Sequence, residues 1–275
     1  MVSTEIGKRR RLGRIINNGK MLVVPIDDSL IFGPYDGLFN LEQTVGLIET
    51  ATPSAILAYR GSISLLHSCT IPIILNVTAS TTTGDHVHKV LTNTVEDAIK
   101  IDADCVAAHV NFANEKENEM LKQLSAVISK ADSFGIPVLA ISYPRKSVEG
   151  KDYNYLDLDE ESYTKLICHA TRTVAELGAD IIKTQYTGSA ESFEKVVNSA
   201  LGRPVIIAGG PLKQVDEAYL MAKNVIDAGG AGISYGRNVF NAQNIPAFLA
   251  GLREIVFEGA DVSRALKTYR GYCNV

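Results

Sequence analysis

Short runs of aliphatic residues recur along the chain, separated by longer segments in which apolar residues return every three or four positions. The short runs are continuously apolar, which is typical of strands that are buried on both faces of a parallel sheet. We therefore predict eight strands, at residues 21–26, 54–58, 72–76, 104–110, 136–143, 180–184, 204–208 and 230–235.

The segments between the strands have the apolar spacing of amphipathic helices, most clearly at residues 121–134, 161–177, 190–200 and 215–228. Gly178 and Gly229 each stand between a helix and the next strand, which is typical of a helix C-cap. Repeated strand–helix units in a chain of this length predict an α/β fold, a single (β/α)8 TIM barrel. An open doubly wound sheet is the competing architecture, but no GxGxxG motif follows the first strand.

The N-terminal segment combines a basic cluster at residues 8–11 with Leu12 and Ile15 at helical spacing. We predict a basic amphipathic helical arm at residues 1–20 and a barrel catalytic domain at residues 21–275. We expect this arm to pack on the barrel or on a neighbouring subunit. A nucleic-acid-binding arm is the alternative, but no aromatic residue is interleaved with its charges.

The chain has 275 residues, of which 46% are hydrophobic and 21% charged, and this composition fits one domain with a substantial core. Its formal net charge of −4 argues against a nucleic-acid partner and favours small-molecule ligands. The four cysteines are far apart and form no CxxC pair, so we expect neither a disulfide framework nor structural zinc. No apolar run has the length of a secretory signal or a membrane span, and we predict a cytoplasmic protein.

One lysine, Lys183, lies inside the apolar run at residues 180–184, late in the series of strands. A charged ammonium in apolar surroundings costs several kcal/mol unless it is paired or loses its proton. A lysine that is kept neutral in this way is a nucleophile, and it condenses with a ketone to give a Schiff base. The alternative is a strand-end lysine whose ammonium extends into the solvent.

Other reactive side chains follow the strands at their carboxyl ends, where barrel enzymes assemble their active sites. Asp27, Tyr143 and Lys183 supply a carboxylate, a phenol and an amine, which suffice to form an imine and to move protons beside it. Because adjacent strand residues point to opposite faces, we expect Asp27 to face the barrel axis and its neighbour Asp28 not to. Asp27 as a helix N-cap and Tyr143 as a buried aromatic residue are the alternatives.

Two glycine loops follow the last two predicted strands, and we assign them to phosphate binding. Gly209 and Gly210 follow the seventh strand, and Gly236 and Arg237 follow the eighth. Glycine lets backbone amides approach an anion closely, and arginine adds a charged fork. A phosphate site in the late-strand loops is typical of TIM barrels.

His86 and His88 are two residues apart, a spacing that binds zinc from a strand, as a metal-dependent aldolase requires. We predict no metal and no other cofactor, because no third ligand is evident and Lys183 would then be redundant. His109 and Arg145 follow the fourth and fifth strands and are candidates for substrate contact. Residues 145–159 form the longest predicted loop, which is either an active-site lid or a plain surface excursion.

The chain resembles the archaeal-type class I aldolase family over nearly its whole length, at residues 142–145, 179–188, 208–211 and 236–240. The sequence at 109–111 resembles that of the family's 2-amino-3,7-dideoxy-D-threo-hept-6-ulosonate synthase branch. The resemblance implies Lys183 as the Schiff-base lysine, Tyr143 and Asp27 as acid/base residues, and the two glycine loops with Arg237 as a phosphate clamp. It also implies a ring-shaped homo-oligomer, commonly a decamer.

Most of that family has Asp-His-Gly where this chain has Asp27-Asp28-Ser29. The sequence Asp-Asp-Ser-Leu is more similar to the aldolases of 3-amino-4-hydroxybenzoate biosynthesis, which join dihydroxyacetone phosphate to L-aspartate 4-semialdehyde. This similarity implies a lyase of secondary metabolism that makes 2-amino-4,5-dihydroxy-6-oxo-7-(phosphonooxy)heptanoate. The aldehyde substrate carries an ammonium and a carboxylate, and Asp28, His109 and Arg145 are the candidates that bind it.

Two other activities of the family stay open, namely the transaldolase-like synthesis of 2-amino-3,7-dideoxy-D-threo-hept-6-ulosonate for aromatic amino acids and the cleavage of fructose 1,6-bisphosphate. A phosphosugar isomerase uses similar phosphate loops with carboxylate chemistry alone, and a metabolite sensor binds without turnover. The acceptor, the stereochemistry, the oligomer size and the first proton transfer, by Tyr143 or Asp27, also stay open.

Overall fold

All eight predicted strands are present, and each begins and ends within two residues of its predicted bounds. The computed structural model describes residues 4–149 and 151–273. The strands are β1 (Met21–Pro25), β2 (Ala55–Ala58), β3 (Ile73–Asn76), β6 (Cys105–Phe112), β7 (Val138–Pro144), β10 (Ile181–Thr184), β11 (Val205–Ala208) and β12 (Gly232–Ser234). They form a closed parallel barrel in the order β1-β12-β11-β10-β7-β6-β3-β2, which confirms the (β/α)8 prediction.

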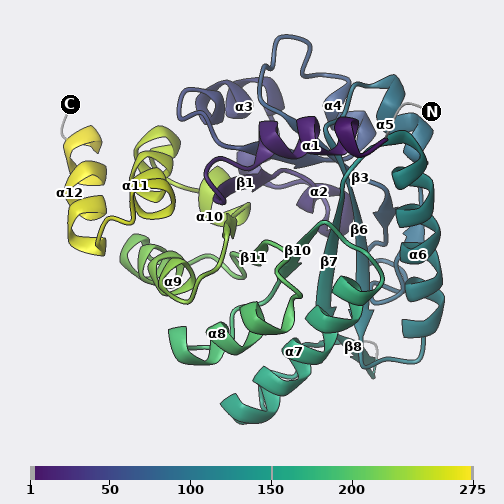
Figure 1. The fold of residues 1–275 in the computed structure, drawn as a ribbon. Coiled ribbons are helices and arrows are strands. Elements are labelled where there is room, and N and C mark those ends of the chain that lie inside the picture. The colour runs from purple at the N-terminus through teal and green to yellow at the C-terminus, as the bar shows by residue number, and fades with distance from the viewer. Residues whose placement is uncertain (1–3, 150, 274–275) are drawn as a thin grey trace.

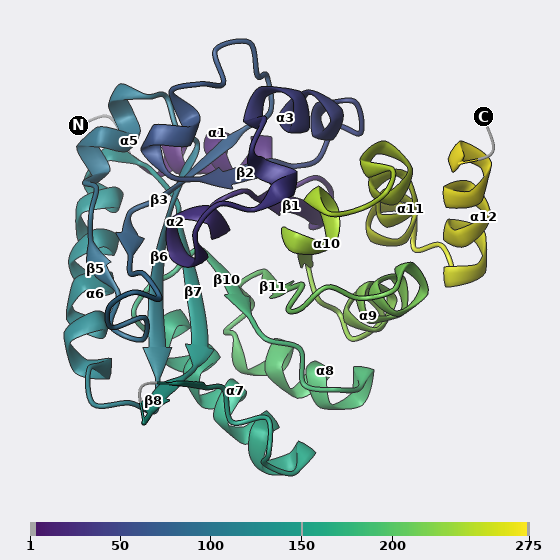
Figure 2. The ribbon, with the colours of Figure 1, turned by 180° about the vertical axis from the view of Figure 1, so that it is seen from behind.

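Helices surround the barrel (Figure 1). The four predicted helices are confirmed as α6 (Glu117–Phe134), α7 (Glu160–Glu176), α8 (Ala190–Ser199) and α9 (Val215–Asp227). The others are α1 (Thr4–Ile15), α2 (Asp28–Phe32), η1 (Asp36–Leu38), α3 (Leu41–Glu49), α4 (Arg60–Ile63), α5 (Val95–Lys100), α10 (Arg237–Phe240), α11 (Ile245–Glu258) and α12 (Val262–Cys273). Figures 1 and 2 show α11 and α12 on the opposite side of the barrel from α6. Across residues 4–149 and 151–273, no helix combines the length and the apolarity that a membrane span requires.

Two short antiparallel pairs extend from the barrel, between β4 (Thr78–Ala79) and β5 (Val90–Leu91) and between β8 (Lys146–Val148) and β9 (Lys151–Tyr153). The second pair lies within residues 145–159, so the prediction of one long loop is wrong for these two strands. Lys146 and Tyr153 are partners in the register, and the ammonium lies 5.0 Å from the ring centre. This cation–π contact stabilises the pairing.

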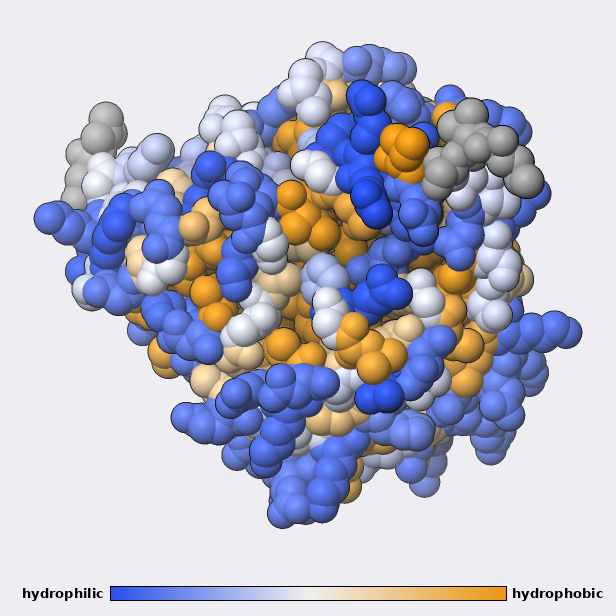
Figure 3. Space-filling view, in the orientation of Figure 1, coloured by the Kyte–Doolittle hydropathy of each residue, from blue (hydrophilic) through white to orange (hydrophobic). Residues whose placement is uncertain are grey.

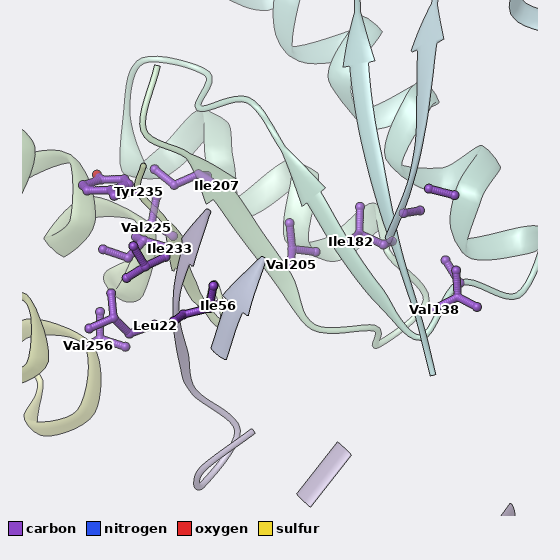
Figure 4. Packing of buried hydrophobic residues seen from close by; sticks show 14 of the residues in the cluster. Leu22, Ile56, Val138, Ile182, Val205, Ile207, Val225, Ile233, Tyr235 and Val256 are labelled. Carbon is purple, nitrogen blue, oxygen red and sulfur yellow. The ribbon is translucent and has the colours of Figure 1, made fainter. Parts of the chain in front are cut away.

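Strand residues alternate between two apolar layers. Met21 and Val23 of β1 lie in the barrel interior, whereas Leu22 and Val24 pack against the helices outside. Figure 4 shows part of the outer layer, which contains Leu22 from β1 and Val256 from α11. Because the alternation continues along each strand, every second residue near a carboxyl end points toward the barrel axis.

Helix α1 covers the amino-terminal end of the barrel. Its Ile15 is 1% exposed and belongs to the apolar cluster of the barrel interior, against which Leu12 and Ile16 also pack. Figure 1 shows α1 in front of the strands, and Figure 2, turned by 180°, shows it beyond them. The apolar side of the N-terminal segment therefore closes one end of the barrel.

The basic residues of α1 meet carboxylates of the barrel. Lys8 forms ion pairs with Asp132 and, at 3.0 Å, with the buried Asp180, and Arg14 forms an ion pair with Asp104. Figure 3 shows strongly hydrophilic residues over α1 on this face of the molecule. The helix thus packs on its own barrel, and acidic side chains of the same chain match part of its charge.

Candidate active site

A cavity of about 440 Å³ opens at the carboxyl ends of the barrel strands. All ten site residues predicted from the sequence line it, and they are Asp27, Asp28, His109, Tyr143, Arg145, Lys183, Gly209, Gly210, Gly236 and Arg237. These residues come from six different strand ends, so the closure of the barrel brings them together.

Strand alternation places three of the polar side chains on the inner face of the barrel. Ile141 of β7 lies in the barrel interior, and it is in register with His109 of β6 and with Lys183 of β10. Tyr143 lies two residues beyond Ile141, on the same face of β7. The amine of Lys183 and the phenol of Tyr143 therefore enter the cavity from neighbouring strands.

Lys183 is only 6% exposed although its side chain lines the cavity, so the alternative of a solvent-directed lysine is wrong. Burial lowers the pKa of Lys183, and the negative charges of Asp27 and Asp28 oppose this shift only in part. Within residues 4–149 and 151–273, its Nζ forms no ion pair closer than 4.0 Å. A lowered pKa makes the amine easier to deprotonate, and the neutral amine is the form that attacks a carbonyl.

Asp27 is held in place by an amide. Its Oδ2 accepts a hydrogen bond of 2.9 Å from Asn76 Nδ2 at the end of β3, and the side chain is 7% exposed. Asp27 occupies the N-cap position of α2, but its side chain makes no capping hydrogen bond. Asp27 thus has the N-cap position of the alternative without the side-chain capping bond, and its carboxylate lies beside the cavity as predicted.

The prediction that Asp28 faces away from the axis is wrong, because both carboxylates line the cavity. Strand β1 already ends at Pro25, and Asp27 has helical backbone angles (φ −95°, ψ −1°), so strand alternation no longer applies at Asp28. Asp28 Oδ2 lies 3.3 Å from Arg237 Nε. Burial and the charge of Asp27 raise the pKa of Asp28 to about 6, against the opposing effect of Arg237.

The two glycine loops lie side by side because Asn238 joins them. Its Nδ2 donates to the carbonyl oxygens of Gly209 (3.3 Å) and Pro211 (3.2 Å), and its Oδ1 accepts from the Lys213 amide (2.8 Å). A Cβ atom at Gly236 would lie 2.8 Å from the carbonyl oxygen of Pro25. The backbone can pack this closely only with glycine there.

Tyr143 lies between two nitrogen-containing side chains. Its ring meets the His109 ring edge-on at 4.8 Å, and the Arg145 guanidinium lies 5.8 Å from the ring centre. Burial raises the pKa of Tyr143 well above its ordinary value, so its hydroxyl stays protonated at neutral pH and acts first as a hydrogen-bond donor.

A second buried lysine, Lys89, also lines the cavity, and sequence reasoning missed it. It is 1% exposed, and its Nζ donates to Ser80 Oγ at 2.6 Å. Burial and the positive charge of Arg145 lower the pKa of Lys89 to about 7. Lys89 lies in a polar segment with no strand pattern. Lys89 could have been predicted as a site residue from its position after a barrel strand, since such segments surround the active site.

The two histidines considered as zinc ligands do not converge. His86 Nε2 lies 3.0 Å from Asp152 Oδ2, whereas His88 Nε2 lies 3.2 Å from Glu119 Oε2 on α6. Among the described residues, no group of three or more histidine, cysteine, aspartate or glutamate side chains has the arrangement of a metal site. In this arrangement each imidazole contacts a different carboxylate.

Comparison with known proteins identifies the family. A family model described as DeoC/LacD family aldolase matches residues 21–242. The chain belongs to the DeoC/LacD aldolase family. It is 37% identical over 266 residues to the 2-amino-3,7-dideoxy-D-threo-hept-6-ulosonate synthase of Halobacterium salinarum, with 96% of each chain covered. It is 31% identical over 270 residues to 2-amino-3,7-dideoxy-D-threo-hept-6-ulosonate synthase 1 of Archaeoglobus fulgidus, covering 97% of this chain and 96% of the relative.

Solved aldolase structures have the same fold. An archaeal fructose 1,6-bisphosphate aldolase has a TM-score of 0.81 and 26% identity, covering 92% of this chain and 100% of its own. A Schiff base forming fructose-1,6-bisphosphate aldolase has a TM-score of 0.80 and 26% identity, covering 91% and 100%. The prediction of a class I aldolase is confirmed, and the family membership argues against the isomerase and sensor alternatives.

Proposed function

We propose that Lys183 forms a Schiff base with a ketone substrate and that the enzyme builds a seven-carbon amino-keto acid. The observation that carries this proposal is the buried amine of Lys183, whose pKa is lowered, on the strand next to Tyr143 and in the cavity that Asp27 also lines. A neutral amine, an acid and a base are the groups that imine and enamine chemistry uses.

The names of the two relatives favour one product. In 2-amino-3,7-dideoxy-D-threo-hept-6-ulosonate, the ketone is at carbon 6 and the amino group at carbon 2. Aldol disconnection between carbons 4 and 5 gives L-aspartate 4-semialdehyde and a three-carbon ketone unit that ends in a methyl group. We propose this product ahead of the 7-phosphorylated one implied by Asp28 and Ser29, because the relatives support it better.

The two products differ in where the phosphate goes. With dihydroxyacetone phosphate as donor, the phosphate stays on carbon 7 of the product. A methyl at carbon 7 instead requires a donor that ends in a methyl ketone. In a larger phosphorylated ketose of this kind, the three-carbon unit with the methyl group remains on the lysine while a phosphorylated aldehyde leaves. In both reactions a phosphate binds at the loops of Gly209, Gly210 and Gly236 beside Arg237.

The steps follow from the groups present. Neutral Lys183 adds to the ketone, and loss of water gives an iminium ion that withdraws electrons from the neighbouring carbon. Loss of a proton or of an aldehyde from that carbon gives an enamine, which attacks the aldehyde of the acceptor. Tyr143 and Asp27 carry the protons, and water then releases the product and restores the amine.

The product mass tests this proposal. The protein is incubated with L-aspartate 4-semialdehyde and either dihydroxyacetone phosphate or a phosphorylated ketose that ends in a methyl ketone and carries its phosphate at the other end. A seven-carbon amino-keto acid without phosphate supports the transaldolase-like reaction, and the same skeleton with one phosphate supports the dihydroxyacetone phosphate reaction. Absence of both products with every donor contradicts the proposal.

Cleavage of fructose 1,6-bisphosphate is a second candidate, because solved aldolases of that substrate share the fold at 26% identity. A coupled triose phosphate assay without any acceptor measures this activity. Rapid cleavage together with no use of the amino-acid aldehyde would favour the second candidate over the first.

A further inference from the structure

The cavity is more positively charged than the chain as a whole. Five basic side chains and two carboxylates line it, namely Lys89, Arg145, Lys183, Lys213 and Arg237 with Asp27 and Asp28, and four basic side chains remain when Lys183 is neutral. The whole chain, in contrast, has a formal net charge of −4. A cavity with this excess of cations fits a ligand, or a pair of ligands, that carries more than one anionic group.

The cations form two groups on opposite sides of Lys183. Arg237 lies beside the glycine loops that follow β11 and β12, whereas Lys89 and Arg145 follow β3 and β7. In the barrel order, β10 with Lys183 stands between β11 and β7. A phosphate at the glycine loops therefore leaves the second group of cations unoccupied.

Lys89 is a buried lysine that has no carboxylate beside it among the described residues. Its Nζ donates to Ser80 Oγ, and the Ser80 hydroxyl itself donates to the carbonyl oxygen of His86 at 2.7 Å. No carboxylate of the described residues lies within ion-pair distance of Lys89. Since an ammonium has three N–H donors, a bound anion has donors left to accept from.

Arg145 is held in place and still has donors free. Its Nε donates to Asn154 Oδ1 at 2.8 Å, and its Nη1 lies 2.9 Å from His86 Nε2 and 3.9 Å from Asp152 Oδ2. Its Nη2 makes no hydrogen bond to a side chain or ion pair within residues 4–149 and 151–273. The guanidinium is thus oriented by its neighbours and can still receive an anion.

His109 is the third side chain on the side of the cavity that contains Lys89 and Arg145. The side chain is 8% exposed and lines the cavity, and its Nε2 is buried without a hydrogen-bond partner in the described structure. Burial and the charges of Lys89 and Arg145 hold the pKa of His109 well below its ordinary value. A neutral imidazole has one N–H, and a buried polar nitrogen without a partner costs free energy until a ligand satisfies it.

We propose that Lys89, Arg145 and His109 form a subsite for the carboxylate of the acceptor aldehyde, separate from the phosphate clamp. This inference rests on the proposed aldol reaction with an amino-acid aldehyde. A carboxylate has two oxygens and about four lone-pair sites, which suit an ammonium, a guanidinium and an imidazole N–H. Binding there places the other end of the acceptor toward Lys183.

A pair of unreactive ligands tests the subsite without turnover. L-Homoserine has the carboxylate of aspartate semialdehyde and a hydroxyl in place of the aldehyde, and 3-aminopropan-1-ol lacks the carboxylate. Calorimetry should show that Lys89→Met weakens L-homoserine binding about tenfold or more and leaves 3-aminopropan-1-ol binding unchanged. Lys122→Met, at an exposed lysine of α6, is the matched control and should change neither.

Binding of inorganic phosphate distinguishes the roles of the two groups of cations. Lys89→Met should leave phosphate binding unchanged, whereas Arg237→Met should weaken it. If Lys89→Met weakens phosphate as strongly as L-homoserine, this side binds a second phosphate and the carboxylate subsite is wrong. Equal binding of L-homoserine to wild type and Lys89→Met also overturns it.

Kinetics then distinguish failure of the subsite from failure of the proposed reaction. Lys89→Met should raise KM for L-aspartate 4-semialdehyde and leave borohydride trapping of the ketone on Lys183 unchanged. Lys89→Arg should restore part of the loss, because the charge returns. If wild type is trapped but Lys89→Met is not, the proposed subsite is wrong. If wild type itself is not trapped, the proposed function is wrong, and the L-homoserine binding measurements then decide the subsite separately.

Discussion

At the amino-terminal end of the barrel, Lys8 and Arg14 of α1 pair with carboxylates, whereas at the carboxyl-terminal end two buried lysines have no such partner. Lys8 of α1 pairs with Asp132 and Asp180, and below it Ile15 packs into the barrel interior. At the other end, Lys89 and Lys183 are 1% and 6% exposed, and neither forms an ion pair in the described parts of the chain.

The difference in pairing distinguishes residues that stabilise the fold from residues that are available to bind a ligand. Matched pairs and apolar contacts at the amino end contribute to the free energy of unfolding. Buried amines without partners reduce that free energy, because each loses its hydration, or its proton, without a compensating carboxylate. Substitutions at the two ends should therefore affect different quantities, namely stability at one and activity at the other.

The largest effect is expected for Lys183→Ala. It should lower activity by more than about a thousandfold, because no other group at this position forms the imine. The unfolding temperature should stay the same or rise, since a buried amine with a lowered pKa is removed. Steady-state assays and thermal unfolding check the two parts, and substantial remaining activity contradicts the role of Lys183.

Tyr143→Phe is expected to reduce kcat by about a hundredfold to ten thousandfold through the loss of one proton-transfer group. Packing against His109 should persist, because the ring remains. Comparison with Asp27→Asn by pH–rate profiles assigns the first proton transfer. A Tyr143→Phe enzyme with wild-type kcat would show that Asp27 and water suffice.

A substitution at the amino-terminal end of the barrel should lower stability and leave activity unchanged. Ile15→Ala removes a side chain that is 1% exposed, and it should lower the free energy of unfolding by about 2–5 kcal/mol. The kcat of the folded enzyme should be unchanged, because α1 lies at the far end of the barrel from the cavity. Urea unfolding measures the first quantity, and a large fall in kcat without a fall in stability would disagree with this account.

The smallest effect concerns the pair of Asp28 and Arg237. The pKa of Asp28 is about 6, so below that pH its carboxyl is neutral and Arg237 is free for phosphate. As the pH rises through 6, Asp28 ionises and competes for Arg237, and KM for the phosphorylated donor should rise a few-fold. Asp28→Asn should remove this rise while the ionisation of the phosphate itself stays the same. A pH dependence identical in both enzymes would contradict the competition.

The parts of the molecule that follow strand periodicity could be predicted from the sequence. The continuously apolar runs predicted the barrel, and alternation along β7 and β10 places Tyr143 and Lys183 on the inner face. These positions depend on local backbone geometry, which the sequence encodes within a few residues.

Positions that depend on loops and distant contacts could not be predicted in this way. Asp28 turns toward the cavity because the chain has already left strand geometry at Asp27. Lys89 is buried by packing of its segment against β6 and α6. Asn111 Nδ2 of β6 donates to the Val87 carbonyl oxygen at 2.6 Å, and the Lys89 amide lies 3.4 Å from Met120 Sδ of α6. No pattern within the segment itself records such contacts.

Borohydride reduction tests the central claim most directly. The wild-type protein is reduced in the presence of dihydroxyacetone phosphate, fructose 1,6-bisphosphate or a phosphorylated ketose that ends in a methyl ketone, and its peptides are mapped by mass spectrometry. The account predicts one covalent adduct, located on the peptide that contains Lys183 and absent from Lys183→Ala. An adduct on Lys89 instead, or no adduct with any of the three ketones, would contradict the assignment of Lys183 as the Schiff-base lysine.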